Sequence, residues 1–325
     1  MKVVFVGVFY YGGPVRNLFT IFKIYKKIAK CFETVGIDCY YFSKQNEILP
    51  SEKTLTEQQF YDMLPDADLV FIWNGGLGKE IEIAEKCRQQ GTSLYFMELG
   101  WLPQTNTFYF DPKGVNYAST LTDWQYKPIS DDEVEYTRTK LAFYHGKVAM
   151  LTGIKFEDDF VFVPFQVEND SQIKKYSPRI KNMQELIDYC VAHIPGNIYF
   201  KKHPKDEPGE LKYPERCRIY SKGTTHDFLT QCKYVVTINS TVGVEALSYN
   251  KPVITLGQAF YGGLGMAYEV KEDRIMENAV KWAEEGKVAL GRICAFMCYL
   301  FHRQWHHREL ENPEKILTLI DGLTE

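Results

Sequence analysis

Phe160 to Asp170 have the sequence FVFVPFQVEND. The stretch begins with apolar residues, mainly Val and Phe, and charged residues bound it on both sides, as is typical of a buried strand in a parallel sheet. Polar side chains follow at the carboxyl end of this strand: Gln166, Glu168, Asn169 and Asp170. Ligands bind at the carboxyl ends of strands in open α/β sheets, so this stretch predicts a site as well as a strand. The alternative is a strand that simply ends in a polar loop.

The chain after this stretch continues the alternation of strands and helices. Strands are predicted at residues 197–202, 218–220, 234–238 and 252–256, and helices at 180–193, 226–231 and 242–248. After Gly257 only helices are predicted, over residues 273–305 and 313–323. Such alternation indicates a parallel sheet covered by helices.

The chain before this stretch shows the same alternation. Strands are predicted at residues 2–8, 38–42, 68–74 and 93–98, and a short strand followed by a turn at 108–116. Helices are predicted between Pro14 and Gly36, at residues 79–90, and at 131–151. Neither glycine cluster, at 12–13 or at 75–76, forms the G-x-G-x-x-G motif, so a dinucleotide site of that type has weak support.

Composition bounds the class of protein. The 325 residues are 45% hydrophobic and 25% charged with a net charge of −4, which is the balance of a globular protein and gives no electrostatic case for nucleic acid. The eight cysteines form no CxxC pair and no metal-ligand spacing. No apolar run approaches the roughly 20 residues that a membrane span needs. We therefore expect a cytoplasmic protein.

The polar residues at three strand ends of the second half are the candidate ligands. They are Gln166 and Asp170, Lys202 and His203, and Ser240 and Thr241. A helix is predicted directly after Thr241, and its first N–H groups and dipole favour an anion such as phosphate. Glu245, one turn into that helix, could accept hydrogen bonds from ribose hydroxyls. The alternatives are that Ser240 or Thr241 is only an N-cap, and that Glu245 is only a surface residue.

Two successive Rossmann-like halves with a helical tail resemble the two-domain glycosyltransferase architecture called GT-B. The fold class predicted is thus α/β, with a GT-B architecture and a C-terminal helical tail. We expect an N-terminal, acceptor-side domain at residues 1–155 and a nucleotide-sugar domain at 156–292, joined by a hinge at 152–159. The tail, residues 293–325, is expected to cross back to the first domain.

The order and spacing of the motifs make the resemblance more specific. The chain is similar to the bacterial capsule polysaccharide proteins that include the retaining β-Kdo transferases (KpsC/KpsS-like), which transfer 3-deoxy-D-manno-oct-2-ulosonic acid from CMP-Kdo. The matching residues are Gln166-x-x-Asn169-Asp170, the sequence KKHP ending in His203-Pro204, Asn239-Ser240-x-x-Gly243-x-Glu245, and Lys251-Pro252 before Gly257. In the first half, Glu98-x-Gly100-Trp101 followed by Asp111 and Gly114 matches a further block. The chain departs from the family at Leu102-Pro103-Gln104, where an Arg-Ser pair is usual, and this leaves the donor and acceptor open.

The resemblance implies a function and assigns roles to the residues. It implies a retaining transferase of capsule or lipopolysaccharide biosynthesis that moves a Kdo-like sugar from CMP-Kdo to a glycan or lipid-linked acceptor, without a cofactor or metal. Asp170 is the expected nucleophile, with Glu168 as its rival, and Glu98 is the expected acid/base or intermediate-stabilising group. The residues expected to bind the donor are Gln166, Lys202, His203, Asn239, Ser240, Thr241 and Glu245.

Two other classes of function remain open from the sequence. One is a GT-B enzyme with another nucleotide sugar, either a transferase or a UDP-sugar 2-epimerase. The other is a non-catalytic component that binds glycan or scaffolds capsule assembly. Two basic segments have no assigned role. Residues 23–30 could form either a peripheral contact with the inner face of the inner membrane or a solvated helix face. Residues 302–308 combine His, Arg and Trp.

Overall fold

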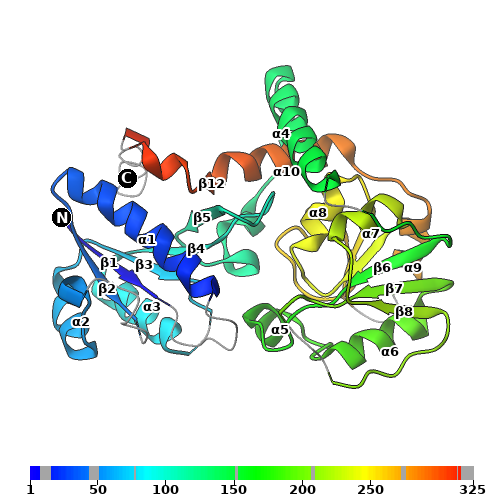
Figure 1. Cartoon of the computed structure of the whole chain (residues 1–325), viewed down its shortest axis with the longest axis horizontal. Coiled ribbons are helices and arrows are strands. Elements are labelled where there is room, and N and C mark those ends of the chain that lie inside the picture. The colour runs from blue at the N-terminus through cyan, green and yellow to red at the C-terminus, as the bar shows by residue number, and fades with distance from the viewer. Residues whose placement is uncertain are drawn as a thin grey trace. The chain divides into compact units, whose positions relative to one another are not determined.

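The computed structural model describes residues 1–7, 16–43, 51–76, 78–150, 153–205, 209–271, 276–312 and 314–315. The chain forms two compact units (Figure 1). Unit 1 comprises Met1–Thr120 together with Arg303–Glu325, and unit 2 comprises Leu121–His302. Each unit is built on its own sheet, and each is described separately below.

The described residues of unit 1 form a six-stranded sheet in the order β12-β5-β4-β3-β1-β2. The strands are β1 (Lys2–Val6), β2 (Asp38–Phe42), β3 (Leu69–Trp73), β4 (Ser93–Leu99), β5 (Thr107–Asp111) and β12 (Trp305–His306). β1 to β4 run parallel, whereas β5 is antiparallel to both β4 and β12. The carboxyl ends of β3 and β4 therefore lie at one edge of the sheet.

Helices bury both faces of this sheet. α1 (Arg16–Thr34) places Tyr25, Ile28 and Phe32 against Phe5 and Phe71 of the strands. Strand residues that alternate with these, such as Val4 and Ile72, are also fully buried, as expected of parallel strands covered on both sides. α2 (Glu57–Met63), with a Thr56 capping box, and α3 (Gly78–Gln90) complete the layers of unit 1. Short 3₁₀ turns lie at Ser51–Lys53, Leu64–Asp66, Asn116–Ala118 and Glu309–Glu311.

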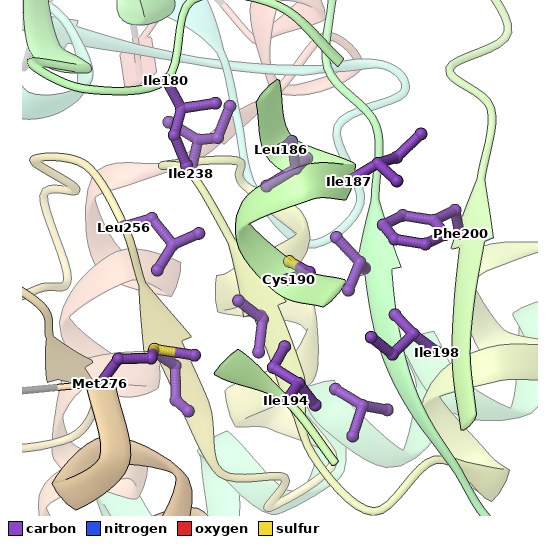
Figure 2. Packing of buried hydrophobic residues seen from close by; sticks show 14 of the residues in the cluster. Ile180, Leu186, Ile187, Cys190, Ile194, Ile198, Phe200, Ile238, Leu256 and Met276 are labelled. Atoms are coloured by element: carbon purple, nitrogen blue, oxygen red, sulfur yellow. The ribbon is translucent and has the colours of Figure 1, made fainter. Parts of the chain in front are cut away.

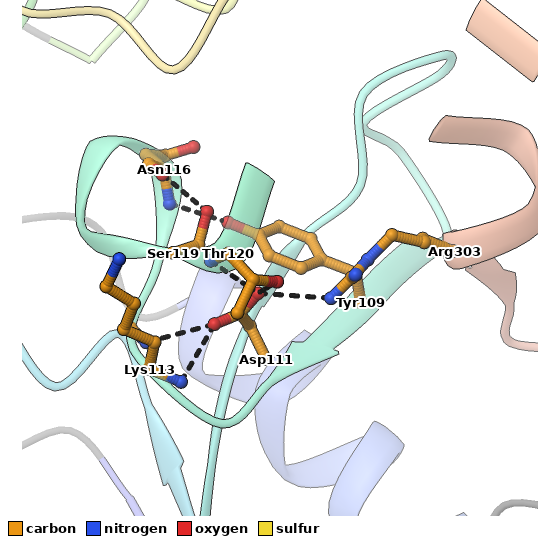
Figure 3. Close-up of polar contacts among 8 residues, drawn as sticks. Tyr109, Asp111, Lys113, Asn116, Ser119, Thr120 and Arg303 are labelled. Atoms are coloured by element: carbon orange, nitrogen blue, oxygen red, sulfur yellow. Dashed lines mark hydrogen bonds and ion pairs between the residues drawn. The ribbon is translucent and has the colours of Figure 1, made fainter. Parts of the chain in front are cut away.

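The end of β5 is fixed by a buried carboxylate (Figure 3). Asp111 is fully buried, and its oxygens accept hydrogen bonds from the N–H groups of Lys113, Gly114 and Thr120 and from the Thr120 hydroxyl. Arg303, 192 residues further along the chain, completes the group with an ion pair of 3.1 Å. These hydrogen bonds explain why Asp111 and Gly114 occur in the motif of the first half, because the loop after β5 is folded around the Asp111 side chain.

The described residues of unit 2 form a wholly parallel sheet in the order β11-β10-β9-β6-β7-β8. The strands are β6 (Phe160–Pro164), β7 (Asn197–Lys201), β8 (Cys217–Tyr220), β9 (Val235–Thr237), β10 (Val253–Thr255) and β11 (Tyr268–Glu269). From β8 to β11 this is the 3-2-1-4-5-6 order of the Rossmann fold. The order reverses between β6 and β9, and the crevice for a ligand in such sheets lies at this switch point.

One face of this sheet carries a large apolar core (Figure 2). Leu186, Ile187 and Cys190 of α6 (Met183–His193) pack on Ile198 and Phe200 of β7. α5 (Ser171–Tyr176) and α9 (Met276–Glu284) contribute further residues to the same cluster. α7 (Thr225–Gln231) and α8 (Val242–Ser248) complete the described helices next to the sheet, and α7 packs Phe228 on Phe162, 4.7 Å between ring centroids.

The division of the chain differs from the boundaries expected from the sequence. The units divide after Thr120 rather than at 155, so α4 (Asp131–Ala149) belongs to unit 2. Side-chain contacts explain this: Tyr144 of α4 donates to Glu245, and His145 lies 3.0 Å from the Ser248 hydroxyl. The polar stretch at 152–159 is thus internal to unit 2. α10 (Leu290–Arg303) also belongs to unit 2 almost entirely, and the return to unit 1 begins at Arg303 rather than at 293.

Some local expectations need correction. The prediction of helices only after Gly257 is wrong, because β11 and β12 are strands of two residues each, too short for an alternating pattern. The long predicted helix divides into α9 and α10 around Gly286, whose φ of 64° suits glycine. α5 was not predicted. The helix expected at 313–323 falls largely outside the described residues, and the glycine cluster at 12–13 falls wholly outside them.

Candidate functional site

Two amide side chains meet at the switch point of unit 2. Gln166 follows β6 and Asn239 follows β9. The Gln166 Nε2 donates to Asn239 Oδ1 at 2.9 Å, and the Asn239 backbone N–H donates to Gln166 Oε1 at 3.1 Å. Both residues are buried, so these reciprocal hydrogen bonds satisfy groups that would otherwise be costly to desolvate. The structure thus brings together two of the predicted site residues at the position where a Rossmann sheet binds its ligand.

Asp170 lies beside this pair, at the start of α5. It is the N-cap of that helix, and its Oδ1 accepts from Gln172 N at 2.8 Å. The carbonyl of Gln172 in turn accepts from Asn239 Nδ2 at 3.0 Å, which links Asp170 to the amide pair through one helical turn. The Asp170 side chain is exposed, as a group that reacts with a ligand must be.

Glu168, the rival carboxylate, is held differently. Its Oε1 accepts from Met183 N at 2.7 Å, at the first residue of α6. The carboxylate therefore satisfies the start of a second helix, away from the first turn of α5. This arrangement favours Asp170 over Glu168 as the carboxylate that reaches a ligand.

Lys202 and His203 follow β7, the neighbour of β6 in the sheet. The Lys202 N–H donates to Tyr220 O, which extends the pairing with β8 by one residue. The His203 Nδ1 accepts from Lys205 N at 3.2 Å, so a neutral His203 ring carries its proton on Nε2. Both side chains are partly exposed at the carboxyl edge, where an N–H donor suits a phosphate.

Ser240 and Thr241 form the entry to α8. The Ser240 hydroxyl accepts from Val242 N at 3.2 Å, and Thr241 is the N-cap residue without a side-chain capping bond. Tyr261 donates to the Ser240 carbonyl at 2.5 Å, and a Cβ at Gly243 would overlap the Tyr261 hydroxyl. The glycine of this motif is thus required because the Tyr261 ring packs directly on the first turn of α8.

Glu245 lies in a partly buried polar site rather than on an open surface. Its Oε2 accepts a hydrogen bond from the Tyr144 hydroxyl at 3.3 Å. Burial raises the pKa of Glu245 to about 7, although Tyr144 and the Lys201 ammonium act in the opposite direction. Burial likewise lowers the pKa of Lys201, and Asp227 and Glu245 partly offset that effect. A carboxyl with such a pKa can gain or lose a proton near neutral pH, which is uncommon outside functional sites.

Glu98, the predicted residue of unit 1, lies near the carboxyl end of β4. Its Oε1 accepts from the Leu99 N–H at 2.9 Å, and its Oε2 accepts from Asn74 Nδ2 at 2.8 Å. Asn74 follows β3 directly, and the β3–β4 pairing of Trp73 with Met97 places it beside Glu98. Glu98 is partly buried.

The His-rich segment at 302–308 is divided between the units. His302 stacks on Tyr136 in unit 2, while His306 and His307 lie in unit 1 with ring centroids 4.6 Å apart. Within the described residues, Glu133, Cys298 and His302 offer ligand atoms within 4.8 Å of one another. The Glu133 carboxylate already accepts both the N–H and the hydroxyl of Ser130 in a capping box, so this group is explained by the helix start. The expectation of no metal stays a prediction.

Sequence reasoning missed three residues of these sites. A weak sequence pattern could have indicated Asn74, because it is a polar residue that follows a predicted buried strand and precedes Gly75-Gly76. A similar pattern could have indicated Lys201, which directly precedes the Lys202-His203 pair. Tyr144 had none, since it lies 101 residues from Glu245 in the sequence and on a helix without a motif.

The sequence between residues 147 and 302 matches the family model described as capsule polysaccharide biosynthesis protein. Over these residues the chain resembles the capsule polysaccharide biosynthesis family. Curated relatives agree: protein FixF of Sinorhizobium fredii is 32% identical over 205 residues, covering 60% of this chain and 50% of FixF. The capsule polysaccharide export protein KpsS of Escherichia coli is 32% identical over 132 residues, covering 35% of this chain and 34% of KpsS. The chain spans half or less of the length of these two relatives.

A solved structure extends the family's likeness to the whole fold. The β-Kdo 2,7 transferase of Thermosulfurimonas dismutans KpsC superimposes with a TM-score of 0.59 at 20% identity, covering 91% of this chain and 90% of the other. The GT-B architecture and the resemblance to KpsC/KpsS-like capsule proteins, both expected from the sequence, are thereby confirmed. Among the described residues, no helix combines the length and the apolarity needed to cross a membrane.

Proposed function

We propose that this protein is a retaining glycosyltransferase of capsule or lipopolysaccharide biosynthesis, which moves a Kdo-like sugar from CMP-Kdo to a glycan or glycolipid acceptor. The observation that carries the proposal is the Gln166–Asn239 pair at the switch point of unit 2, with Asp170 one helical turn away. The family match covers residues 147–302, most of this unit, and the fold of a β-Kdo transferase covers nearly the whole chain. Together they support a nucleotide-sugar site here rather than a generic α/β scaffold.

The donor nucleotide belongs at the carboxyl edge of the unit 2 sheet in this proposal. The Ser240 and Thr241 hydroxyls and the His203 Nε2–H supply donors to the phosphate, with the Lys202 ammonium as counter-charge. Glu245 accepts from a ribose hydroxyl, in exchange for the bond it now receives from Tyr144. No metal is required, because these groups offset the phosphate charge.

The chemical step needs a nucleophile that forms a sugar–enzyme bond while CMP leaves, and an acceptor hydroxyl that then displaces the enzyme carboxylate. We assign the nucleophile to Asp170. Its Oδ1 caps α5, which fixes the carboxylate without burying it. Gln166, held by Asn239, orients the sugar or the carboxylate. Glu98 of unit 1 acts on the acceptor proton or on the charge of the intermediate.

The nucleotide is tested by isothermal titration of CMP against UDP. The proposal expects preference for CMP, and expects Glu245→Ala to weaken CMP binding by about 1.5–3 kcal/mol, the range for a hydrogen bond to a charged group. Glu215→Gln, an exposed carboxylate replaced in the same unit, is the control and leaves CMP affinity unchanged. A preference for UDP would instead support another GT-B enzyme, such as a UDP-sugar 2-epimerase.

The nucleophile is tested by intact-protein mass spectrometry after incubation with CMP-Kdo. Wild-type protein gains the mass of one sugar, and Asp170→Asn does not. Asn caps helices as well as Asp does, so this substitution removes the nucleophile and keeps α5 intact. Glu168→Gln is the matched control and still forms the adduct. An Asp170→Asn protein that transfers sugar at the wild-type rate rejects the assignment. Release of no CMP by wild type with any acceptor favours a non-catalytic, glycan-binding role.

The acceptor is proposed to be lipid-linked, with the protein at the inner face of the inner membrane. Lys23, Lys26 and Lys30 are exposed on α1 of unit 1 and supply positive charge for an anionic surface. Flotation with vesicles containing phosphatidylglycerol, compared with neutral vesicles, tests this. Equal recovery with both kinds of vesicle excludes an electrostatic contact.

A further inference from the structure

The carboxyl edge of unit 1 holds Glu98 by two donors, one for each carboxylate oxygen. The Leu99 N–H points at Oε1 from 2.9 Å, and the Asn74 amide points at Oε2 from 2.8 Å. An ionised carboxylate only accepts hydrogen bonds, whereas a protonated one must donate from one oxygen. With an N–H group directed at each oxygen, the surroundings favour the charged form of Glu98.

Asn74 is itself fixed in the orientation that this bond requires. Its Oδ1 accepts from Gly76 N at 3.1 Å, so the amide cannot rotate its oxygen toward Glu98 without losing that bond. Its φ is 61°, in the left-handed region that Asn and Asp enter more readily than other non-glycine residues. Such a conformation costs free energy and persists where the surroundings determine it, often at functional sites.

We propose that Asn74 is a positioning residue that holds Glu98 as a carboxylate, so that Glu98 serves as a base or as a charge that stabilises the intermediate, and not as a proton donor. The inference rests on the proposed transferase function and chooses between the roles that the sequence left open for Glu98. In the role of base, the Glu98 carboxylate takes the proton of the acceptor hydroxyl as the acceptor oxygen forms its bond to the anomeric carbon, and the carboxylate that held the sugar leaves as that carbon's bond to it breaks.

Other titratable groups surround Glu98 within the described residues. Tyr25 of α1 and Tyr109 of β5 both interact electrostatically with Glu98, and Tyr25 also with Glu80 of α3. Burial raises the pKa of both phenols well above the ordinary value, so neither ionises near neutral pH.

The decisive variant is Asn74→Asp. Asp suits the positive φ and has the same shape, but it replaces the donor with a second carboxylate beside Glu98. Two carboxylates that share a site retain a proton to higher pH, so the acidic limb of the kcat profile shifts upward by about one pH unit or more. KM for the donor, which binds to unit 2, stays within about twofold of wild type. Asn250→Asp makes the same change at an exposed left-handed residue of unit 2 and leaves the profile unchanged.

A double variant separates positioning from folding. When Asn74→Asp is combined with Glu98→Gln, the amide introduced at position 98 can donate to the carboxylate introduced at position 74, which restores a hydrogen bond in the reverse direction. If Asn74 and Glu98 both have only a structural role, activity returns with stability. The proposal expects stability to return while kcat stays as low as in Glu98→Gln alone.

A measurement without substrate keeps this inference separate from the transferase proposal. In protein labelled with ¹³C at the Glu carboxyl carbons, the Glu98 signal is identified by its loss in Glu98→Gln. Its titration should move to higher pH in Asn74→Asp and not in Asn250→Asp. An unchanged titration overturns the role of Asn74 whatever the donor is. A shifted titration in a protein that transfers no sugar overturns the proposed function alone.

Discussion

At the scale of single residues, Glu245 shows how burial sets the pH range of a side chain. Its carboxyl has a pKa raised to about 7 by burial, with the Tyr144 hydroxyl and the Lys201 ammonium as its polar surroundings. An ordinary Glu in the unfolded chain titrates near pH 4.3. Between about pH 4.3 and pH 7 the folded protein therefore binds an additional proton, and the free energy of unfolding falls as the pH rises through that window. Above about pH 7, the contribution of Glu245 to the free energy of unfolding no longer changes with pH.

Glu245→Gln should remove this pH dependence. The amide stays neutral and can still accept from Tyr144, so the variant is expected to match wild type at pH 4 and to exceed it at pH 8. The gain in the free energy of unfolding should be about 3–4 kcal/mol, since the pKa is raised by roughly 2.7 units over that of an unfolded Glu and each unit is worth about 1.4 kcal/mol. Urea unfolding at the two pH values measures it, with Glu215→Gln as the exposed control. A variant less stable than wild type at pH 8 would mean that Glu245 is ionised and paired with Lys201.

At the scale of elements, the sequence predicted what short-range patterns encode. β2 matches its predicted limits, and β6 was recognised from its apolar run because a buried parallel strand has few other signatures. α5, with six residues, is too short to show a helical period. The site residues likewise fall into those that a local sequence pattern predicts and those that it does not. Gln166 and Asp170 follow a predicted strand, whereas Asn74 and Tyr144 act through contacts across 24 and 101 residues, which no local pattern records.

The loop after β5 should depend on Asp111 more than on any exposed ion pair of the described residues. Asp111→Asn keeps the size of the side chain but removes its charge and one of its accepting oxygens, so Arg303 loses its partner in a buried setting. We expect a loss of about 3 kcal/mol or more in the free energy of unfolding, as for other broken buried pairs. Asp159→Asn removes the exposed pair of 3.1 Å with Lys233 and should cost at most about 1 kcal/mol. Thermal and urea unfolding compare the two variants, and equal losses would contradict the role of burial.

At the scale of the whole molecule, a segment late in the chain belongs to the same unit as β1. After α10 the chain returns to unit 1, where β12 pairs with β5 and Leu310 enters the core beside α1. Gln304 binds the loop after β4: its Oε1 accepts from the N–H groups of Trp101 and Leu102, and its Nε2 donates to the Leu102 carbonyl. The segment that closes the fold therefore also supports the loop next to Glu98.

Deletion of residues 303–325 should loosen unit 1 and leave unit 2 intact. Unit 1 would lose the pairing of β12, the buried Leu310 and the partner of Asp111, and burial of one large apolar side chain alone contributes about 1.5–3 kcal/mol. Hydrogen exchange is expected to accelerate in β4, β5 and α1, with unchanged protection in β6 and β9, whose contacts lie within unit 2. Gln304→Ala in the full chain serves as the graded comparison: exchange should rise in the loop after β4 and not in α1, which contacts Leu310 rather than Gln304. Exchange that rises equally in both units would show that the segment stabilises the molecule as one body, and that the division into two independently packed units does not describe its unfolding.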